Sequence, residues 1–498
     1  MMNHLINRLL NFAIQHHLLE EYDRIYTANQ LLHLLQCDSY EYEEIEESLL
    51  TATPILEKMC DHAVALGLIH DTVTERDLFD ARIMNCCMPR PSEVIHKFYE
   101  NLKKDAKLAT KEYYQLSIAS NYIRKDRTDK NIVWKSSCEY GDLDITINLS
   151  KPEKDPKEIA LARQLPSTNY PKCLLCKENE GFYGNLNHPA RNNHRIIPME
   201  FSGNKWFMQY SPYTYYNEHC IVLNAEHIPM QICKQTFENL FGFIEKLPHY
   251  FIGSNADLPI VGGSILTHDH YQGGCYHFAM EKANIDQIFD LPQFPNVKIG
   301  RVKWPMSVIR LQSKQRQEIL DCADLILAAW RDYNDETLDI LSHSGDVLHN
   351  TITPIARFNT SGEYELDLVL RNNRTSEEYP LGIFHPHQEV HNIKKENIGL
   401  IEVMGLAVLP ARLKDEMNEL KPLLIQRVTC LSDKLKKHED WIKGIYEQYE
   451  DINEENVDEI IEKAISDTFK IVLTHAGVFK DDETGHLGFA RFIEKLKK

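Results

Sequence analysis

The sequence lacks any long apolar run and carries few basic residues for its length. No segment approaches the ~18 consecutive apolar residues of a membrane-spanning helix, so we expect no membrane insertion. Its 55 Lys and Arg residues are outnumbered by 74 Asp and Glu residues, giving a formal net charge of -19. An acidic chain of this kind has no general affinity for nucleic acid or anionic membranes. A few local Arg and Lys side chains still allow it to bind one small anionic ligand.

Cysteine is also sparse, with 12 residues scattered through a chain of 498. Thinly spread cysteines in a long acidic chain are typical of reduced thiols in the cytosol, not of a disulfide framework. Residues 1–19 contain Asn, Arg, Gln and His among apolar residues, which predicts an amphipathic helix and not a signal peptide. We therefore expect a cytoplasmic protein.

The chain has 498 residues, whereas a single hydrophobic core stops growing near ~250–300 residues, so several domains are expected. Residues 42–66 have apolar side chains close to helical spacing, and the first third of the chain is predicted to be helical. Near residue 130 the pattern changes, because residues 142–149 alternate polar and apolar as a half-buried strand does. The predicted regions are a helical region 1–130, a catalytic half 131–295, a second half 296–430 and a helical tail 431–498.

The second half of the chain is again predicted to consist of strands, loops and helices in succession. Residues 308–311 and 367–370 are predicted strands, and residues 318–333 are a predicted helix. Residues 396–420 are predicted to form one long helix that contains Pro410. The pattern favours an α+β fold.

The segment His268-Asp-His270-Tyr-Gln272 carries the strongest chemical signal. Alternate residues of a strand share a face, so these two histidines and Gln272 are predicted to project into one site. A neutral imidazole is a good phosphorus nucleophile, and an amide can donate a hydrogen bond to a phosphoryl oxygen. Glycine pairs at 262–263 and 273–274 let the backbone approach a phosphate closely. The alternative, ordinary polar histidines on a strand edge, does not account for these flanking residues.

Residues 257–274 resemble the signature of the class II galactose-1-phosphate uridylyltransferases, which belong to the histidine-triad superfamily. The resemblance extends to residues 170–176, 186–191, 216–219 and 397–406. It implies two histidine-triad-like halves with antiparallel sheets and flanking helices, and a homodimer. Thr267 stands where a smaller Ser or Ala is expected, a departure that leaves the implied reaction intact.

The resemblance implies a reaction in two steps. His270 attacks the α-phosphorus of UDP-glucose and glucose 1-phosphate leaves, and galactose 1-phosphate then attacks the uridylyl-His270 intermediate to give UDP-galactose. Superfamily hydrolases often carry a histidine where Gln272 stands, and glutamine accompanies transfer because it cannot activate water. Two alternatives remain: another histidine-triad nucleotidyltransferase or dinucleoside polyphosphate phosphorylase, and a non-catalytic nucleotide-binding protein.

Cys173 and Cys176 have the spacing of half a zinc site. In class I relatives such a pair is completed by a histidine after a strand and by the first histidine of the catalytic strand. The resemblance therefore implies a structural Zn²⁺ held by Cys173, Cys176, His227 and His268, without an organic cofactor. The alternative is two reduced cysteines and two hydrogen-bonded histidines.

Substrate contacts are also implied by the resemblance. Asn192 and Asn193 stand where class I relatives contact the nucleoside, and Asn255 stands where they bind phosphate. The hydroxyl of Ser264 is predicted to reach a phosphate oxygen. Polar neighbours make Arg191, Arg195, Arg371 and Arg374 the candidates to offset substrate charge, and a solvated surface position is the alternative for each of them.

Overall fold

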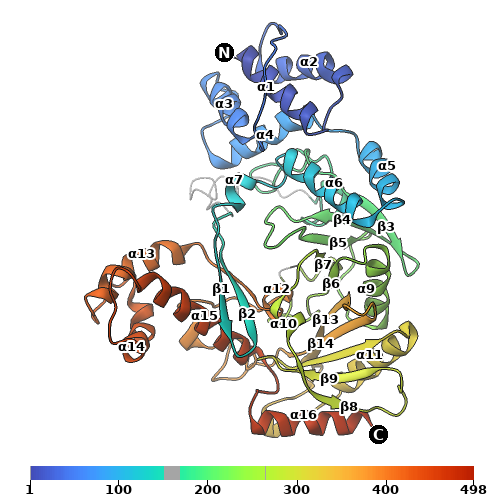
Figure 1. The fold of residues 1–498 in the computed structure, drawn as a ribbon, viewed down its shortest axis with the longest axis vertical. Helices are drawn as coiled ribbons and strands as arrows, with labels where there is room; N and C mark the ends of the chain where they lie inside the picture. The colour runs from blue at the N-terminus through green and yellow to red at the C-terminus, as the bar shows by residue number, and fades with distance from the viewer. Residues whose placement is uncertain (1, 151–168, 264, 498) are drawn as a thin grey trace. The chain divides into compact units, whose positions relative to one another are not determined.

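The computed structural model describes residues 2–150, 169–263 and 265–497 (Figure 1). They form two compact units, each built from segments far apart in the sequence. Unit 1 comprises Met1–Lys130, Ser150–Ile228 and His268–His270, and unit 2 comprises Asn131–Leu149, Pro229–Thr267 and Tyr271–Lys498. Helices and mainly antiparallel strands confirm the α+β class. Within the described residues, no helix has the length and apolar character needed to cross a membrane.

Helices dominate the first part of unit 1, as predicted. Among its described residues, unit 1 contains the helices α1 (Met2–Gln15), α2 (Arg24–Leu35), α3 (Thr53–Ala65), α4 (Val73–Cys86), α5 (Pro91–Leu102), α6 (Ala106–Ala119) and α7 (Lys125–Thr128). The helix α1 buries an apolar stripe that includes Leu5, Leu9 and Phe12, and this stripe packs in one core with apolar residues of α2, α3 and α4.

The predicted helix over residues 42–66 is wrong in its first half, because α3 begins only at Thr53. The side chains of Asn7 and Asn11 on α1 donate hydrogen bonds to the backbone carbonyls of Glu41 (2.8 Å) and Ile45 (2.7 Å). The carbonyl groups of Glu41 and Ile45 thus have hydrogen-bond partners on α1, and they do not need the partners that a helix would supply. Long-range partners thus override the local spacing.

Unit 1 also contains the antiparallel strands β3 (Ile197–Phe201), β4 (Asn204–Tyr210) and β5 (Cys220–Asn224), in the order β3-β4-β5. Tyrosine hydroxyls join the helical region to this sheet. The hydroxyl of Tyr113 on α6 donates to the carbonyl of Arg195 (2.5 Å). The hydroxyl of Tyr122, in the segment after α6, donates to the carbonyl of Tyr210 on β4 (3.1 Å), so these two tyrosines hold α6 and the segment after it against β4 and the residues that precede β3.

Unit 2 is organised around antiparallel strands in the order β7-β6-β13-β14-β10-β9-β8. Their bounds are β6 (Phe251–Gly253), β7 (His270–Gly274), β8 (Ile285–Phe289), β9 (Lys298–Val302), β10 (Val308–Ser313), β13 (Asn350–Phe358) and β14 (Tyr364–Asn372). β11 (His343–Ser344) and β12 (Val347–Leu348) form a separate pair. The helices are α9 (Lys234–Lys246), α10 (Ala279–Lys282), α11 (Arg316–Arg331), α12 (Leu400–Val403), α13 (Arg412–Ile425), α14 (Glu439–Gln448), α15 (Val457–Ala476) and α16 (Glu483–Leu496). The strands near 308 and 367, the helix near 318 and the helical tail are confirmed.

The predicted single helix over residues 396–420 is wrong. Between α12 and α13 the chain forms β15 (Leu406–Leu409), which pairs in parallel with β2 (Gly141–Ile147). β2 also pairs with β1 (Ile132–Cys138), beside which it lies in Figure 1. Gly405 ends the helical turn with φ +102°, and a Cβ there would lie 2.9 Å from the ring of Trp304. The break therefore depends on a glycine conformation and on a strand partner more than 250 residues away.

Candidate active site

His270 opens β7 and is 6% exposed. Its Nδ1 lies 2.8 Å from the backbone carbonyl oxygen of His268. Because a carbonyl oxygen only accepts, Nδ1 carries the proton and Nε2 keeps its lone pair. Burial lowers the pKa of His270 to about 4, so the ring is neutral at neutral pH. A buried neutral imidazole with one free nitrogen is equipped to act as a nucleophile.

The strand predicted to carry the reaction is shorter than expected, because β7 begins at His270 and not at His268. The preceding residue, Asp269, is held by two backbone bonds: its N–H donates to Ile228 (2.7 Å), and its carbonyl accepts from Asn224 (2.9 Å). Gln272 lies in β7 opposite Gly253, half-buried. As strand neighbours two positions apart, His270 and Gln272 face the same side of β7.

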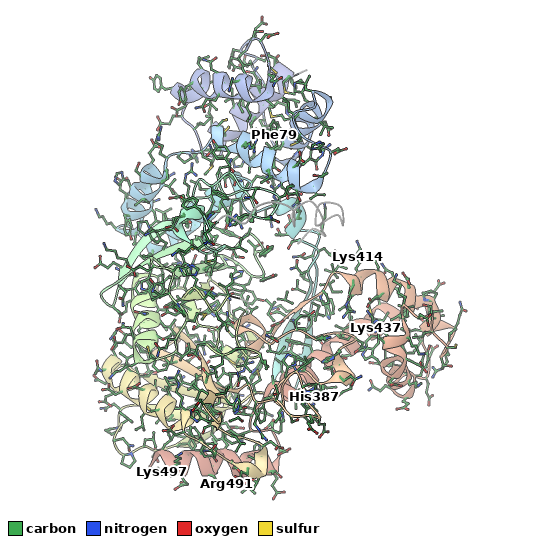
Figure 2. All side chains as sticks on the ribbon, turned by 180° about the vertical axis from the view of Figure 1, so that it is seen from behind. Phe79, His387, Lys414, Lys437, Arg491 and Lys497 are labelled. Carbon is green, nitrogen blue, oxygen red and sulfur yellow. The ribbon has the colours of Figure 1, made fainter. Side chains whose placement is uncertain are left out.

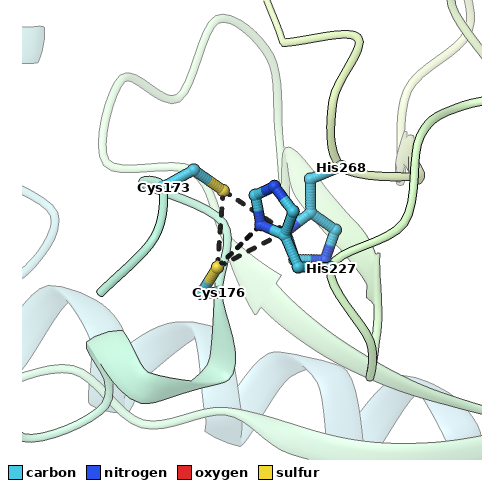
Figure 3. Close-up of side chains that lie close together, drawn as sticks. All are labelled: Cys173, Cys176, His227 and His268. Atoms are coloured by element: carbon cyan, nitrogen blue, oxygen red, sulfur yellow. Dashed lines mark hydrogen bonds between the residues drawn. The ribbon is translucent and has the colours of Figure 1, made fainter. Parts of the chain in front are cut away.

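The four predicted metal ligands lie together in unit 1 (Figure 3). Their ligand atoms are all within 4.8 Å of one another. Cys173 Sγ lies 3.6 Å from Cys176 Sγ and 3.3 Å from His268 Nδ1, and Cys176 Sγ lies 3.2 Å from His227 Nδ1. Tetrahedral zinc ligands at roughly 2.0–2.3 Å from the ion are separated by roughly 3.3–3.8 Å, so this spacing fits a metal.

The orientation of His268 supports the same interpretation. Its Nε2 lies 2.9 Å from the carbonyl oxygen of Asn224, so Nε2–H donates and Nδ1 presents a lone pair toward the thiols. Burial raises the pKa of the Cys176 thiol to about 11, and a divalent cation is the group that would offset this by stabilising the thiolate. Asn224 is not among the site residues predicted from the sequence, although it directly follows the apolar run of β5, a position at which a predicted strand ends.

Arg191 and Asn193 line a cavity of about 380 Å³ in unit 1. The Asn193 amide donates to the backbone carbonyl of Ser120 (2.9 Å). The Arg191 guanidinium lies 5.4 Å from the ring centroid of Tyr122 and donates to the carbonyl of Ala190 (2.9 Å). None of the ion pairs formed by the described residues involves Arg191, so its charge remains available to an anionic ligand.

Asn192 is fully buried beside these residues. Neither side-chain atom, Nδ2 nor Oδ1, has a hydrogen-bond partner among the described residues. Each buried unsatisfied group of this kind costs about 1–3 kcal/mol. Asn192 therefore holds hydrogen-bonding capacity that this part of the chain leaves unused.

The predicted phosphate contacts lie in unit 2. Asn255 is buried, and its Oδ1 accepts from the backbone N–H of Leu400 (2.9 Å). Gly263 packs against the same side chain, since a Cβ there would lie 2.7 Å from Asn255 Nδ2. The amide nitrogen thus faces the glycine-rich segment before β7. Ser264 lies outside the described residues.

A second histidine group lies in unit 2, formed by His387, Glu389 and His475 (His387 is labelled in Figure 2). The backbone N–H of His387 donates to Nδ1 of His475 (3.3 Å). In the neutral ring the proton is then on Nε2, which faces the Glu389 carboxylate at 3.4 Å. The two imidazoles also stack, with centroids 4.3 Å apart. With both His475 nitrogens engaged, the arrangement favours a hydrogen-bonded polar group over a metal site.

Comparison with known proteins places these residues in a family context. The galactose-1-phosphate uridyl transferase N-terminal domain matches residues 17–229, and the corresponding C-terminal domain matches residues 243–442. Galactose-1-phosphate uridylyltransferase of Clostridium acetobutylicum is 61% identical over 498 residues, covering 100% of both chains. That of Bacillus subtilis is 51% identical, covering 99% of this chain and 97% of its own. A crystal structure of yeast Ap4A phosphorylase covers 60% of this chain and 88% of its own at 12% identity and TM-score 0.33, too weak a likeness to bear on the fold.

Proposed function

Because the chain belongs to the galactose-1-phosphate uridylyltransferase family, we propose that it transfers UMP from UDP-glucose to galactose 1-phosphate through His270. The observation that carries the proposal is the state of this imidazole. Its Nδ1–H is committed to the His268 carbonyl, which leaves Nε2 as a neutral nucleophile. Full-length identity to relatives with that printed activity supports the choice of substrates.

The reaction follows from this tautomer. Nε2 of His270 forms a bond to the α-phosphorus of UDP-glucose, and the bond from that phosphorus to the bridging oxygen breaks, releasing glucose 1-phosphate. An oxygen of the galactose 1-phosphate phosphate then attacks the same phosphorus. The P–N bond breaks, UDP-galactose leaves and the neutral ring is restored. The hydrogen bond from Nδ1–H to the His268 carbonyl stabilises the positive charge that develops on the ring in each step.

Gln272 favours transfer over hydrolysis in this scheme. Its amide can donate to a non-bridging phosphoryl oxygen but cannot accept a proton from water at neutral pH. The uridylyl intermediate is thereby preserved for the sugar phosphate acceptor. A dinucleoside polyphosphate phosphorylase would share the nucleophile but would act on a different nucleotide, so activity with galactose 1-phosphate separates the two.

We propose that the metal held by Cys173, Cys176, His227 and His268 is zinc in a structural role. The ion would neutralise the two thiolates and fix the His268 imidazole, whose backbone carbonyl orients His270. The donor set of two sulfurs and two imidazole nitrogens is one that zinc favours. We further propose a cytoplasmic homodimer that requires no organic cofactor.

The test is incubation with UDP-glucose alone, followed by intact mass measurement under basic conditions that preserve phosphoramidates. A single uridylyl adduct is expected, lost in acid and absent from His270→Ala. His343→Ala, which alters an exposed histidine of β11, is the matched control and should retain the adduct. Continued release of glucose 1-phosphate without any adduct would refute the covalent mechanism.

A further inference from the structure

Arg371 lies on β14 in unit 2, and its side chain is fully buried, which excludes a solvated surface position. Its Nη2 donates to the backbone carbonyl of Ile398 (2.9 Å), and its Nη1 donates to Oγ1 of Thr353 (3.4 Å). Among the described residues it forms no ion pair, because the Glu402 carboxylate that attracts it is paired with Lys394. Burial lowers the pKa of Arg371 to about 10, so the guanidinium is still charged at neutral pH. A buried charge without a counter-ion is costly, so packing alone does not explain an arginine here.

The carbonyl group that Arg371 holds opens the segment 398–402, which leads into α12. Leu400 in this segment is buried against β6, because a Cβ on Gly253 would lie 2.8 Å from Leu400 Cδ1. Gly253 pairs with Gln272 in the register of β6 and β7. The segment that Arg371 holds therefore packs beside the strand position of the glutamine proposed to bind a phosphoryl oxygen.

The same segment sets the orientation of the Asn255 amide. The backbone N–H of Leu400 lies 2.9 Å from this amide, and since a backbone N–H only donates, the atom that faces it is the oxygen Oδ1. The amide lies between two glycines. A Cβ on Gly399 would lie 3.2 Å from Oδ1, and a Cβ on Gly263 would lie 2.7 Å from Nδ2. The amide nitrogen is thereby directed, as a donor, toward the glycine-rich segment before β7.

A half-turn of this amide would exchange its donor for an acceptor. Nδ2 can donate a hydrogen bond to a phosphoryl oxygen, whereas Oδ1 would repel it. The two orientations have nearly the same shape, so the hydrogen bond from Leu400 is what distinguishes them. Arg371 holds the carbonyl two residues before that N–H, and the charge of the guanidinium strengthens this hydrogen bond.

We propose that Arg371 is a positioning residue for the phosphate site. It fixes the segment 398–402 so that the Leu400 N–H holds Asn255 with its amide nitrogen toward the phosphate. This inference rests on the proposed function, since it assumes that Asn255 binds a phosphate of the same reaction. Arg371 acts through the segment and through Asn255, and it does not touch the substrate.

The test is the rate at which the full-length protein forms the uridylyl adduct with UDP-glucose in the first turnover. Asn255→Ala should slow this step about 10²-fold, as the loss of one donor to a developing charge does. Arg371→Met removes the guanidinium but keeps a long buried side chain, and should slow the step about tenfold, because the amide can then point either way. The double variant should be no slower than Asn255→Ala alone, since Arg371 acts through Asn255. Losses that multiply would overturn the proposal.

Arg301→Met is the matched control. Arg301 lies on β9 in unit 2 and forms an ion pair with Asp286, so its loss should leave the rate of adduct formation unchanged. Arg371→Lys keeps the charge but replaces the planar guanidinium with a single ammonium group, so its rate should lie between those of Arg371→Met and the unaltered chain. A folded Arg371→Met protein that reacts at the unaltered rate would overturn the proposal.

A second pair of variants tests the same link should Arg371→Met fail to fold. Leu400→Pro removes the N–H that donates to Asn255, at the first position of α12, where proline is tolerated. Leu400→Ala also loses the buried leucine side chain but keeps the N–H, so it should form the adduct about tenfold faster than Leu400→Pro. If the unaltered chain forms no adduct, the proposed function itself fails. If it forms one and the two Leu400 variants react equally fast, only the positioning role fails.

Discussion

The His268 imidazole donates a 2.9 Å hydrogen bond from Nε2 to the backbone carbonyl of Asn224, at the end of β5. This bond fixes the tautomer of His268 and turns Nδ1 toward the Cys173 thiol, 3.3 Å away. The backbone carbonyl of His268 in turn accepts from His270. His268 therefore links the proposed metal group, through its side chain, to the proposed nucleophile His270, through its backbone carbonyl.

Cys176→Ser should release the metal. The substitution removes one of two thiolate ligands, so zinc measured by elemental analysis should fall from about one to less than about 0.2 per chain. The midpoint of thermal unfolding should fall by several degrees, because structural metal binding contributes to folding free energy. Cys430→Ser, at an exposed cysteine, is the control and should change neither quantity. Less than about 0.2 zinc in the unaltered protein, with activity intact after chelation, would contradict the assignment.

Gln272→His should increase hydrolysis of UDP-glucose relative to transfer. An imidazole can accept a proton from water where the amide cannot, so water competes with galactose 1-phosphate for the intermediate. The measured quantity is the ratio of UMP to UDP-galactose formed at a fixed acceptor concentration. Gln287→His, on the exposed part of β8, controls for an added histidine and should leave this ratio unchanged. A constant ratio in Gln272→His would remove the role assigned to the glutamine.

Arg191→Gln should raise the KM for UDP-glucose about tenfold, because a charge-assisted hydrogen bond to a phosphate contributes roughly 1.5–3 kcal/mol and the amide retains part of it. Thermal stability should be little affected, since Arg191 forms no ion pair among the described residues. Arg127→Gln is the comparison variant. Arg127 forms an ion pair with Asp77, so its substitution should lower the midpoint of thermal unfolding more than it changes the KM for UDP-glucose. An unaltered KM in Arg191→Gln would show that its charge does not reach the substrate.

Asp367→Asn should strongly destabilise unit 2. The Asp367 carboxylate is fully buried between Arg310 (2.7 Å) and Arg357 (2.6 Å). Breaking a buried pair by changing one partner costs about 3–5 kcal/mol, because it leaves uncompensated buried charge. Thermal denaturation should reveal a clearly lower midpoint. Asp440→Asn, at a side chain that is 97% exposed, is the control and should have little effect.

The same pair predicts a pH effect. Burial alone would raise the Asp367 pKa, but the attraction of Arg310 and Arg357 outweighs it and the pKa is lowered. A carboxyl group with a lower pKa in the folded state stabilises the fold above its unfolded pKa and loses that contribution as the pH falls through the folded value. Asp367→Asn should therefore lose less stability on acidification than the unaltered chain. An identical acid response in unfolding experiments would exclude this contribution.

The sequence alone predicts the chemistry proposed for the candidate site. Alternate residues of a strand share a face, so the spacing of His268, His270 and Gln272 predicts that they project into one site. The spacing of Cys173 and Cys176 predicts half of a metal site. The four residues that the resemblance implies as metal ligands lie together in the structure. The strands near residues 142, 308 and 367 were also predicted, because period-two or short apolar runs are local signals.

Tertiary structure decided everything that depends on a distant partner. The strand β15 exists because it pairs with β2, and local helical spacing around residues 396–420 could not reveal that partner. The tautomers of both catalytic-segment histidines depend on carbonyl groups placed by the fold, at Asn224 and His268. The helix α4 joins the cavity of Arg191 only because Gly184 permits close approach of a loop more than 100 residues later in the chain. Residue types specify what a side chain can do, but burial and hydrogen-bond partners set its state.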